Sequence, residues 1–237
     1  MTDLAIVEEG VRVEIGECCL DTEADVALDD AYADLDGDEQ ARAASFIFDR
    51  DRDRFVRAHG FLRRQLGAFL DLPPKKVPIA ASEGGKPFLR GHRASFNLSH
   101  SGARAVVAIA RDAEIGIDLE TLDRSDSLVG QLEGLSELCM VGEERRALAT
   151  LTPDRRIRRF LSYWTAKEAR MKLTGEGMSL EPRQIALKLR DGVPVGYLRP
   201  RAPKADLRFI PLASQDAICC LAVRRGRGQA FLHEGRA

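Results

Sequence analysis

The order of hydrophobic patterns along the chain constrains its fold most: one long helical pattern is followed by several strand patterns, and the same order then occurs again. Apolar side chains recur every three or four residues over 51–70 and over 154–174, which is the spacing of one helix face. Shorter apolar or alternating segments follow each helix and predict strands. They cover residues 94–99, 104–111 and 115–120 after the first helix, and 184–190, 193–199, 207–211, 217–224 and 229–233 after the second.

This order predicts an α+β protein with two similar, pseudo-symmetric lobes, each a long helix packed on an antiparallel sheet. The 237 residues are enough for two modest domains that share an interface. We place the N-terminal lobe at residues 1–115 and the C-terminal lobe at residues 116–237. The remaining predicted elements are strands over 11–20 and 76–80, helices over 38–50 and 143–151, a turn at 83–87 and a mobile connection over 121–135.

The composition is that of a globular protein without a bulk charge that would favour nucleic acid. Lysine and arginine number 36 against 37 aspartate and glutamate, which gives a net charge of −1. The five cysteines form two adjacent pairs and a single residue, a poor disulfide framework, and no CxxC motif occurs. The N-terminus lacks the basic region of a signal peptide, and no apolar run approaches the ~20 residues of a membrane span. We therefore expect a cytoplasmic protein with reduced thiols.

Two carboxylates lie at the end of a candidate strand in the sequence GIDLE, at Asp118 and Glu120. Side chains alternate between the two faces of a strand, so these two acids point the same way. Mg²⁺ fits such a pair, because it is bound by one or two carboxylates together with waters and phosphate oxygens. The alternative interpretation is a pair of solvated acids at a strand edge.

A second pair lies on the predicted helix over 154–174, where Glu168 and Lys172 are four residues apart and share one face. Either they form an ordinary helical ion pair, or Glu168 is a metal ligand or base while Lys172 contacts a phosphate. The spacing alone is compatible with both interpretations.

Three further segments could bind an anion. The turn after the strand over 94–99 carries Ser99 and His100, whose side chains could donate to a phosphate. Lys86 lies on the stiff turn GKP, and Arg50 opens a run of alternating charges. The alternative interpretations are a polar surface turn and a solvated helix start.

These segments become specific when they are taken together and in order. They are FxFxRDxxR from residue 46, GKP from 85, FNLSHSG from 96, GIDLE from 116 and WTAKEARMKLTGEG from 164. The ordered set resembles the 4′-phosphopantetheinyl transferase superfamily, in its larger, two-lobed, surfactin-synthetase-activating type. The resemblance covers residues 46–180, and the core positions show no departure from the family pattern.

The resemblance implies a Mg²⁺-dependent enzyme that transfers 4′-phosphopantetheine from coenzyme A to a serine of an apo acyl or peptidyl carrier protein and releases adenosine 3′,5′-bisphosphate. It implies a monomer with the active site in the cleft between the lobes. The implied metal ligands are Asp118, Glu120 and Glu168. The implied coenzyme A ligands are Arg50, Lys86, Ser99, His100 and Lys172, with Arg54 and Lys167 as secondary candidates. Glu168, directly or through a water, and Lys172 are the implied catalytic residues.

Two other functions stay open at this point. One is a non-catalytic module that binds a carrier protein or coenzyme A, against which the intact Asp118, Glu120, Glu168 and Lys172 argue. The other is a different Mg²⁺-dependent phosphoryl-transfer or hydrolytic enzyme, although the chain has no GxxxxGK[ST] phosphate loop. The residues do not indicate whether the acceptor belongs to fatty-acid, polyketide, peptide or siderophore synthesis.

Overall fold

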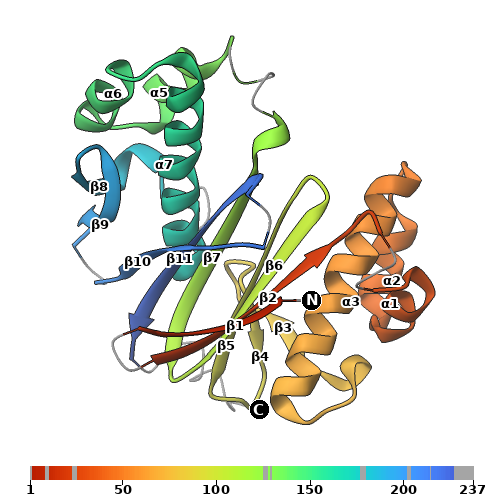
Figure 1. Cartoon of the computed structure of the whole chain (residues 1–237). Coiled ribbons are helices and arrows are strands. Elements are labelled where there is room, and N and C mark those ends of the chain that lie inside the picture. The colour runs from red at the N-terminus through yellow and green to blue at the C-terminus, as the bar shows by residue number, and fades with distance from the viewer. Residues whose placement is uncertain are drawn as a thin grey trace.

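Two antiparallel sheets lie between two long helices, α3 (Asp49–Leu70) and α7 (Pro153–Thr174), as Figure 1 shows. The computed structural model describes residues 2–8, 11–22, 26–124, 128, 130–176, 180–201, 204–213 and 215–226. Helix α3 packs against the first sheet and α7 against the second. The predicted α+β architecture, with a long helix on an antiparallel sheet in each half, is confirmed. The predicted division at residues 115 and 116 falls inside a strand and remains a prediction.

The first sheet belongs to the N-terminal half and has the strand order β1-β2-β6-β5. Its strands are β1 (Thr2–Glu8), β2 (Val11–Cys19), β6 (Arg104–Arg111) and β5 (Ala94–Ser101). The helices α1 (Leu28–Asp34), α2 (Gly37–Ala44) and α3 enclose a core with this sheet. A short helix, η1 (Pro74–Lys76), and the hairpin β3 (Ile79–Ala81) and β4 (Pro87–Leu89) connect α3 to β5.

The second sheet has the order β10-β11-β7, formed by β10 (Asp206–Ile210), β11 (Ala217–Arg225) and β7 (Ala113–Thr121). Around it lie α5 (Leu132–Cys139), α6 (Gly142–Ala149), the short helices η2 (Leu122–Arg124) and η4 (Pro182–Gln184), and the hairpin β8 (Ala186–Arg190) and β9 (Val193–Arg199). These elements enclose the core beneath α7.

A further core lies between the two sheets and joins the halves. Side chains alternate along a strand, so one set faces the helix and the other faces the opposite sheet. Val13 and Val106 of the first sheet meet Ile117, Leu119 and Leu221 of the second sheet in this layer, and each is less than 5% exposed. The two halves therefore share an apolar interface, and strand β7 lies within it.

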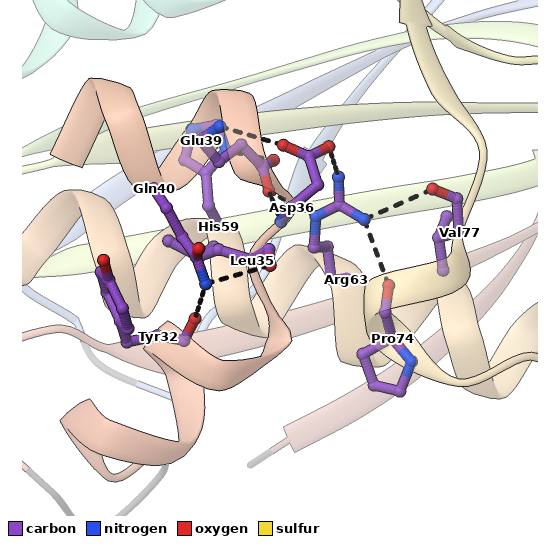
Figure 2. Close-up of polar contacts among 9 residues, drawn as sticks. All are labelled: Tyr32, Leu35, Asp36, Glu39, Gln40, His59, Arg63, Pro74 and Val77. Atoms are coloured by element: carbon purple, nitrogen blue, oxygen red, sulfur yellow. Dashed lines mark hydrogen bonds and ion pairs between the residues drawn. The ribbon is translucent and has the colours of Figure 1, made fainter.

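A buried arginine fastens α2 to α3, as Figure 2 shows. The guanidinium of Arg63, which is 1% exposed, donates to the carboxylates of Asp36 and Glu39 and to the carbonyls of Pro74 and Val77. Asp36 and Glu39 also form the capping box at the start of α2. This cluster ties three helical elements together.

The structure corrects several sequence predictions. The single helix predicted over 38–50 is wrong, because α2 ends at Ala44 and α3 begins at Asp49. Between them Phe48 has extended backbone (φ −106°, ψ 130°), and Phe46 packs on the ring of Phe55 at 5.3 Å. Strands β1 and β4 and helix α5 were not predicted, and residues 76–80 form the end of η1 and the start of β3. The strand predicted over 229–233 lies outside the described residues. Within the described part of the chain, no helix is both long and apolar enough to cross a membrane.

Candidate active site

The centre of the candidate site is Asp118, which lies in β7 with 5% of its surface exposed. Its Oδ1 atom accepts hydrogen bonds from the ammonium of Lys172 at 2.7 Å and from the hydroxyl of Ser99 at 3.0 Å. The same ammonium donates to the Ser99 hydroxyl at 2.9 Å. Burial raises the pKa of Asp118, and the nearby Lys172 offsets only part of this rise. Side chains from β5, β7 and α7 thus form one hydrogen-bonded unit.

Two more carboxylates complete the acidic group. Glu120 follows Asp118 by two residues in β7 and accepts a hydrogen bond from Ser101 at 3.0 Å. Glu168 lies one turn before Lys172 on α7; burial raises its pKa to about 7, and the charges of Asp118 and Glu120 add to this rise. A carboxyl group with a pKa near 7 can take up or release a proton at neutral pH. Glu168 is therefore within electrostatic range of Asp118 and Glu120, and metal binding by these three acids stays a prediction.

Gly116 explains how β7 and α7 come close enough for these contacts. A Cβ atom at this position would lie 2.2 Å from the carbonyl oxygen of Ala169 and 2.3 Å from the amide nitrogen of Leu173. Any side chain here would push the helix away from the strand. The glycine that opens the sequence GIDLE therefore sets the distance between Asp118 on the strand and Glu168 on the helix.

The acidic group has the chemistry of a Mg²⁺ site. The Oδ2 atom of Asp118 is buried and has no hydrogen-bond partner among the described residues, although an unpaired buried oxygen is costly. In that part of the chain, no three histidine, cysteine, aspartate or glutamate side chains form a ready metal cage. Mg²⁺ does not need one, because it keeps several waters and is bound by one or two carboxylates plus substrate phosphates. The donor set of Asp118, Glu120 and Glu168 therefore fits this ion.

Positive charges surround His100, at the end of β5 next to the acidic group. Burial of part of its ring lowers the pKa of His100, and the charges of Lys172, His59, Arg42 and Arg54 lower it further. His59 stacks on Phe55 with ring centroids 4.1 Å apart, and Arg42 lies 5.3 Å over the same Phe55 ring. An anion bound beside His100 would be favoured, because it would offset the repulsion between these positive charges. We call His100, Arg42, Arg54 and His59 the cationic rim.

Two of the predicted phosphate ligands are placed differently. The ammonium of Lys86 donates to the carbonyls of Leu173, at 2.6 Å, and of Ile115, at 3.4 Å, so it caps the C-terminal end of α7. Arg50 is exposed at the start of α3, with its guanidinium 3.7 Å from the carboxylate of Asp51. Contact of either residue with coenzyme A remains a prediction.

Comparison with known proteins agrees with this geometry. Residues 114–222 match the family model described as the 4′-phosphopantetheinyl transferase superfamily, and residues 24–112 match the 4′-phosphopantetheinyl transferase, N-terminal model. Over 165 residues the chain is 39% identical to the 4′-phosphopantetheinyl transferase HetI of Nostoc sp., a match that covers 68% of each chain. The chain belongs to the 4′-phosphopantetheinyl transferase superfamily.

Other members of this superfamily are similar over a smaller share of their length. The 4′-phosphopantetheinyl transferase psf-1 of Bacillus pumilus is 31% identical over 143 residues, which are 60% of this chain and 58% of the relative. The L-aminoadipate-semialdehyde dehydrogenase-phosphopantetheinyl transferase of Xenopus laevis is 26% identical over 160 residues, 64% of this chain and 53% of the relative. The chain thus spans little more than half the length of these two relatives.

The sequence analysis did not predict some of the residues near the site. Arg42 and His59 of the cationic rim come from α2 and α3, and the only signal for them was the spacing of His59 four residues after Phe55. Conversely, the secondary candidate Lys167 is fully buried, with its ammonium 2.7 Å from the carboxylate of Glu144. It does not lie with the acidic group.

Proposed function

We propose that this chain transfers 4′-phosphopantetheine from coenzyme A to a serine of an apo acyl or peptidyl carrier protein in a Mg²⁺-dependent reaction, with release of adenosine 3′,5′-bisphosphate. The observation that carries the proposal is the buried, unpaired Oδ2 of Asp118 next to Glu120 and Glu168. Asp118 pairs with one ammonium, that of Lys172, and its second oxygen has no partner among the described residues, so the site is incomplete. A divalent cation and the phosphates it binds would complete it.

The charge of the donor matches the other half of the site. Coenzyme A carries a pyrophosphate and a 3′-phosphate, while this chain has a net charge of −1, so local cations must bind it. His100 with Arg42 supplies them on the side of α2 and α3, together with Arg54 and His59, which already contact the carboxylates of Asp21 and Glu39. We assign the 3′-phosphate to this cationic rim and the pyrophosphate to the acidic group with Lys172. Lys86, Arg50 and Ser99 stay candidates for further phosphate contacts.

The reaction needs positioning, charge neutralisation and one proton transfer. The carrier serine hydroxyl attacks the phosphorus that bears the pantetheine, and the bond from this phosphorus to the leaving phosphate oxygen breaks. Glu168 takes the serine proton, directly or through a water; because a metal-bound carboxylate is a weak base, the water relay fits its second role as a metal ligand better. Among the described residues, the ammonium of Lys172 uses two of its three donors on Asp118 and Ser99, so its third donor could bind a phosphate oxygen. Mg²⁺, held by Asp118, Glu120 and Glu168, would neutralise charge on the phosphate oxygens.

We further propose that the protein acts as a cytoplasmic monomer, with its active site between an N-terminal lobe (residues 1–115) and a C-terminal lobe (residues 116–237). The contact of Ser99 on β5 with Lys172 on α7 supports a site formed by both halves.

The test is a mass-shift assay. Purified protein, coenzyme A and Mg²⁺ are incubated with a panel of apo carrier domains, each paired with a variant in which the acceptor serine is alanine. We expect the mass of the prosthetic group to be added to at least one carrier and to none of the alanine variants. No gain across the panel contradicts the proposal. Tight coenzyme A binding without transfer would indicate a binding module, and release of adenosine bisphosphate without a carrier would indicate a hydrolase.

A further inference from the structure

The strands β5 and β7 lie side by side but belong to different sheets, and a row of side chains replaces the backbone pairing between them. Three alternate residues of β5 each accept a hydrogen bond from the backbone N–H twenty residues further along. Asn97 Oδ1 accepts from Ile117 at 2.8 Å, Ser99 Oγ from Leu119 at 3.1 Å and Ser101 Oγ from Thr121 at 3.2 Å. We call Asn97, Ser99 and Ser101 the polar ladder.

The polar ladder is buried, so the loss of one of its oxygen atoms would leave a buried backbone N–H without an acceptor. The exposed fractions of Asn97, Ser99 and Ser101 are 7%, 4% and 6%. A buried backbone N–H without an acceptor costs about 1–3 kcal/mol. Each ladder oxygen is therefore held as an acceptor by the strand opposite to it.

This constraint fixes where the serine protons point. A hydroxyl has one proton, and when its oxygen accepts from a backbone N–H the proton is free to go elsewhere. Ser99 donates it to Oδ1 of Asp118 at 3.0 Å. Ser101 faces two acceptors, Oε2 of Glu120 at 3.0 Å and the hydroxyl oxygen of Thr121 at 3.3 Å, of which the carboxylate is the closer and the charged one. The ladder residue opposite Ile117, which precedes the first carboxylate, is Asn97. The ladder residues opposite Leu119 and Thr121, which follow Asp118 and Glu120, are both serines.

We infer that Ser99 and Ser101 are positioning residues: they use the backbone of β7 as a reference and hold the carboxylates of Asp118 and Glu120 in place for the metal ion. The inference rests on the proposed function, in which these acids bind Mg²⁺. It also gives Ser99 a role different from the phosphate contact predicted from the sequence. Outer residues that orient metal ligands typically contribute 10–100-fold to metal affinity.

Strand β5 provides a matched control. Ser95 donates its hydroxyl proton to the carbonyl of Ala113 in β7 at 2.6 Å, so it also links the two strands. Its partner is a carbonyl instead of a carboxylate. A change at Ser95 therefore disturbs the contact between the strands without touching Asp118 or Glu120.

The test measures binding of Mn²⁺ alone, by electron paramagnetic resonance of the free ion, to the full chain without coenzyme A or carrier. We expect Ser99→Ala and Ser101→Ala to bind Mn²⁺ about 10–100-fold more weakly than wild type. Ser95→Ala and the hydroxyl-keeping variant Ser101→Thr should stay within about threefold. Melting curves in EDTA identify the variants that fold.

The outcomes separate the two proposals. Folded Ser99→Ala or Ser101→Ala protein with wild-type Mn²⁺ affinity overturns the inference alone. Loss of affinity in Ser95→Ala equal to that in Ser101→Ala also overturns it, because the effect would then be general strain between β5 and β7. If Ser99→Ala does not fold, the comparison of Ser101→Ala with Ser101→Thr decides. Wild-type protein that binds no Mn²⁺, either alone or after coenzyme A is added, overturns the metal assignment, and the inference with it.

Discussion

Helix α7 carries two lysine–carboxylate pairs with the same N–O distance but different surroundings. Lys167 lies 2.7 Å from Glu144, and Lys172 lies 2.7 Å from Asp118. The side chains of the first pair are both 0% exposed, whereas Lys172 and Asp118 are 28% and 7% exposed. The two lysines point about 140° apart on the helix, so one faces the core of the C-terminal half and the other faces β7.

The Lys167–Glu144 pair is saturated. The Lys167 ammonium uses its three donors on Glu144, the carbonyl of Cys139 and the carbonyl of Pro182. The carboxylate of Glu144 also accepts from the backbone N–H groups of Val141 and Leu187. All three donors of Lys167 are used and both carboxylate oxygens of Glu144 have partners, so we interpret this pair as structural.

The Lys172–Asp118 pair is not saturated within the described residues. Oδ2 of Asp118 is buried without a partner, and Glu168 nearby has a pKa raised to about 7. A structural pair would gain nothing from such an arrangement, because an unpaired buried oxygen lowers stability. The comparison teaches that unused hydrogen-bonding capacity distinguishes a ligand-binding pair from a structural pair, even where the N–O distance and the kind of ion pair are the same.

The largest expected effect is on activity at the unsaturated pair. Asp118→Ala should lower the rate of transfer by about 10³-fold or more, because it removes a carboxylate that would hold the metal ion, whose charge stabilisation is worth several kcal/mol. The fold should persist, since Lys172 is partly exposed and can be solvated. Mass-shift kinetics and far-ultraviolet circular dichroism check both parts. Turnover within about tenfold of wild type would count against the assignment.

The saturated pair should respond in stability. Lys167→Met should lower the free energy of unfolding by about 3–5 kcal/mol, because Glu144 would remain buried without a compensating charge. Urea denaturation measures this loss. Combining it with Glu144→Gln should restore part of the stability, since glutamine removes the uncompensated buried charge and keeps an acceptor for the backbone N–H groups. A loss of unfolding free energy below about 1 kcal/mol in the single variant would show that the pair does not stabilise the fold.

A third lysine, Lys86, contacts the C-terminal end of α7, and its contribution to stability should depend on pH. Burial lowers the pKa of Lys86 from 10.5 to about 8, so between these values the unfolded chain binds a proton that the folded chain does not. The unfolding free energy of wild type should therefore rise with pH across this window relative to Lys86→Met, by on the order of 1–3 kcal/mol. Denaturation of both proteins from pH 7.5 to 10 tests this, and parallel pH profiles would contradict it.

The smallest effect is expected at an exposed pair. Arg54 binds both carboxylate oxygens of Asp21 at 2.6 Å, with Asp21 44% exposed. Asp21→Asn should change the free energy of unfolding by less than about 1 kcal/mol, because solvent screens the pair. Urea denaturation measures the change, and a loss as large as that in Lys167→Met would mean that exposure does not rank these pairs.

Periodicity in the sequence predicted the elements that carry the site. The apolar stripe of α7 placed Glu168 and Lys172 on one face, and strand alternation placed Asp118 and Glu120 together. These predictions hold because they depend only on local geometry.

The features of the site that the sequence did not predict depend on which elements pack against each other in the fold. The hydrogen bond from Ser99 to Asp118 requires β5 to lie beside β7 across a sheet boundary, which no local pattern encodes. Similarly, both lysines were candidates for coenzyme A contact, and the pairing of Lys167 with Glu144 of α6 became visible only in the structure. Tertiary placement decides these cases, not propensity.

Anomalous diffraction from crystals grown with coenzyme A and Mn²⁺ tests the central claim most directly. The account predicts a metal peak within coordination distance of Asp118 Oδ2, with Glu120, Glu168 or a phosphate oxygen as further ligands, and no peak at Glu144. A structure with coenzyme A bound and no metal at Asp118, or with the metal held elsewhere, would contradict it.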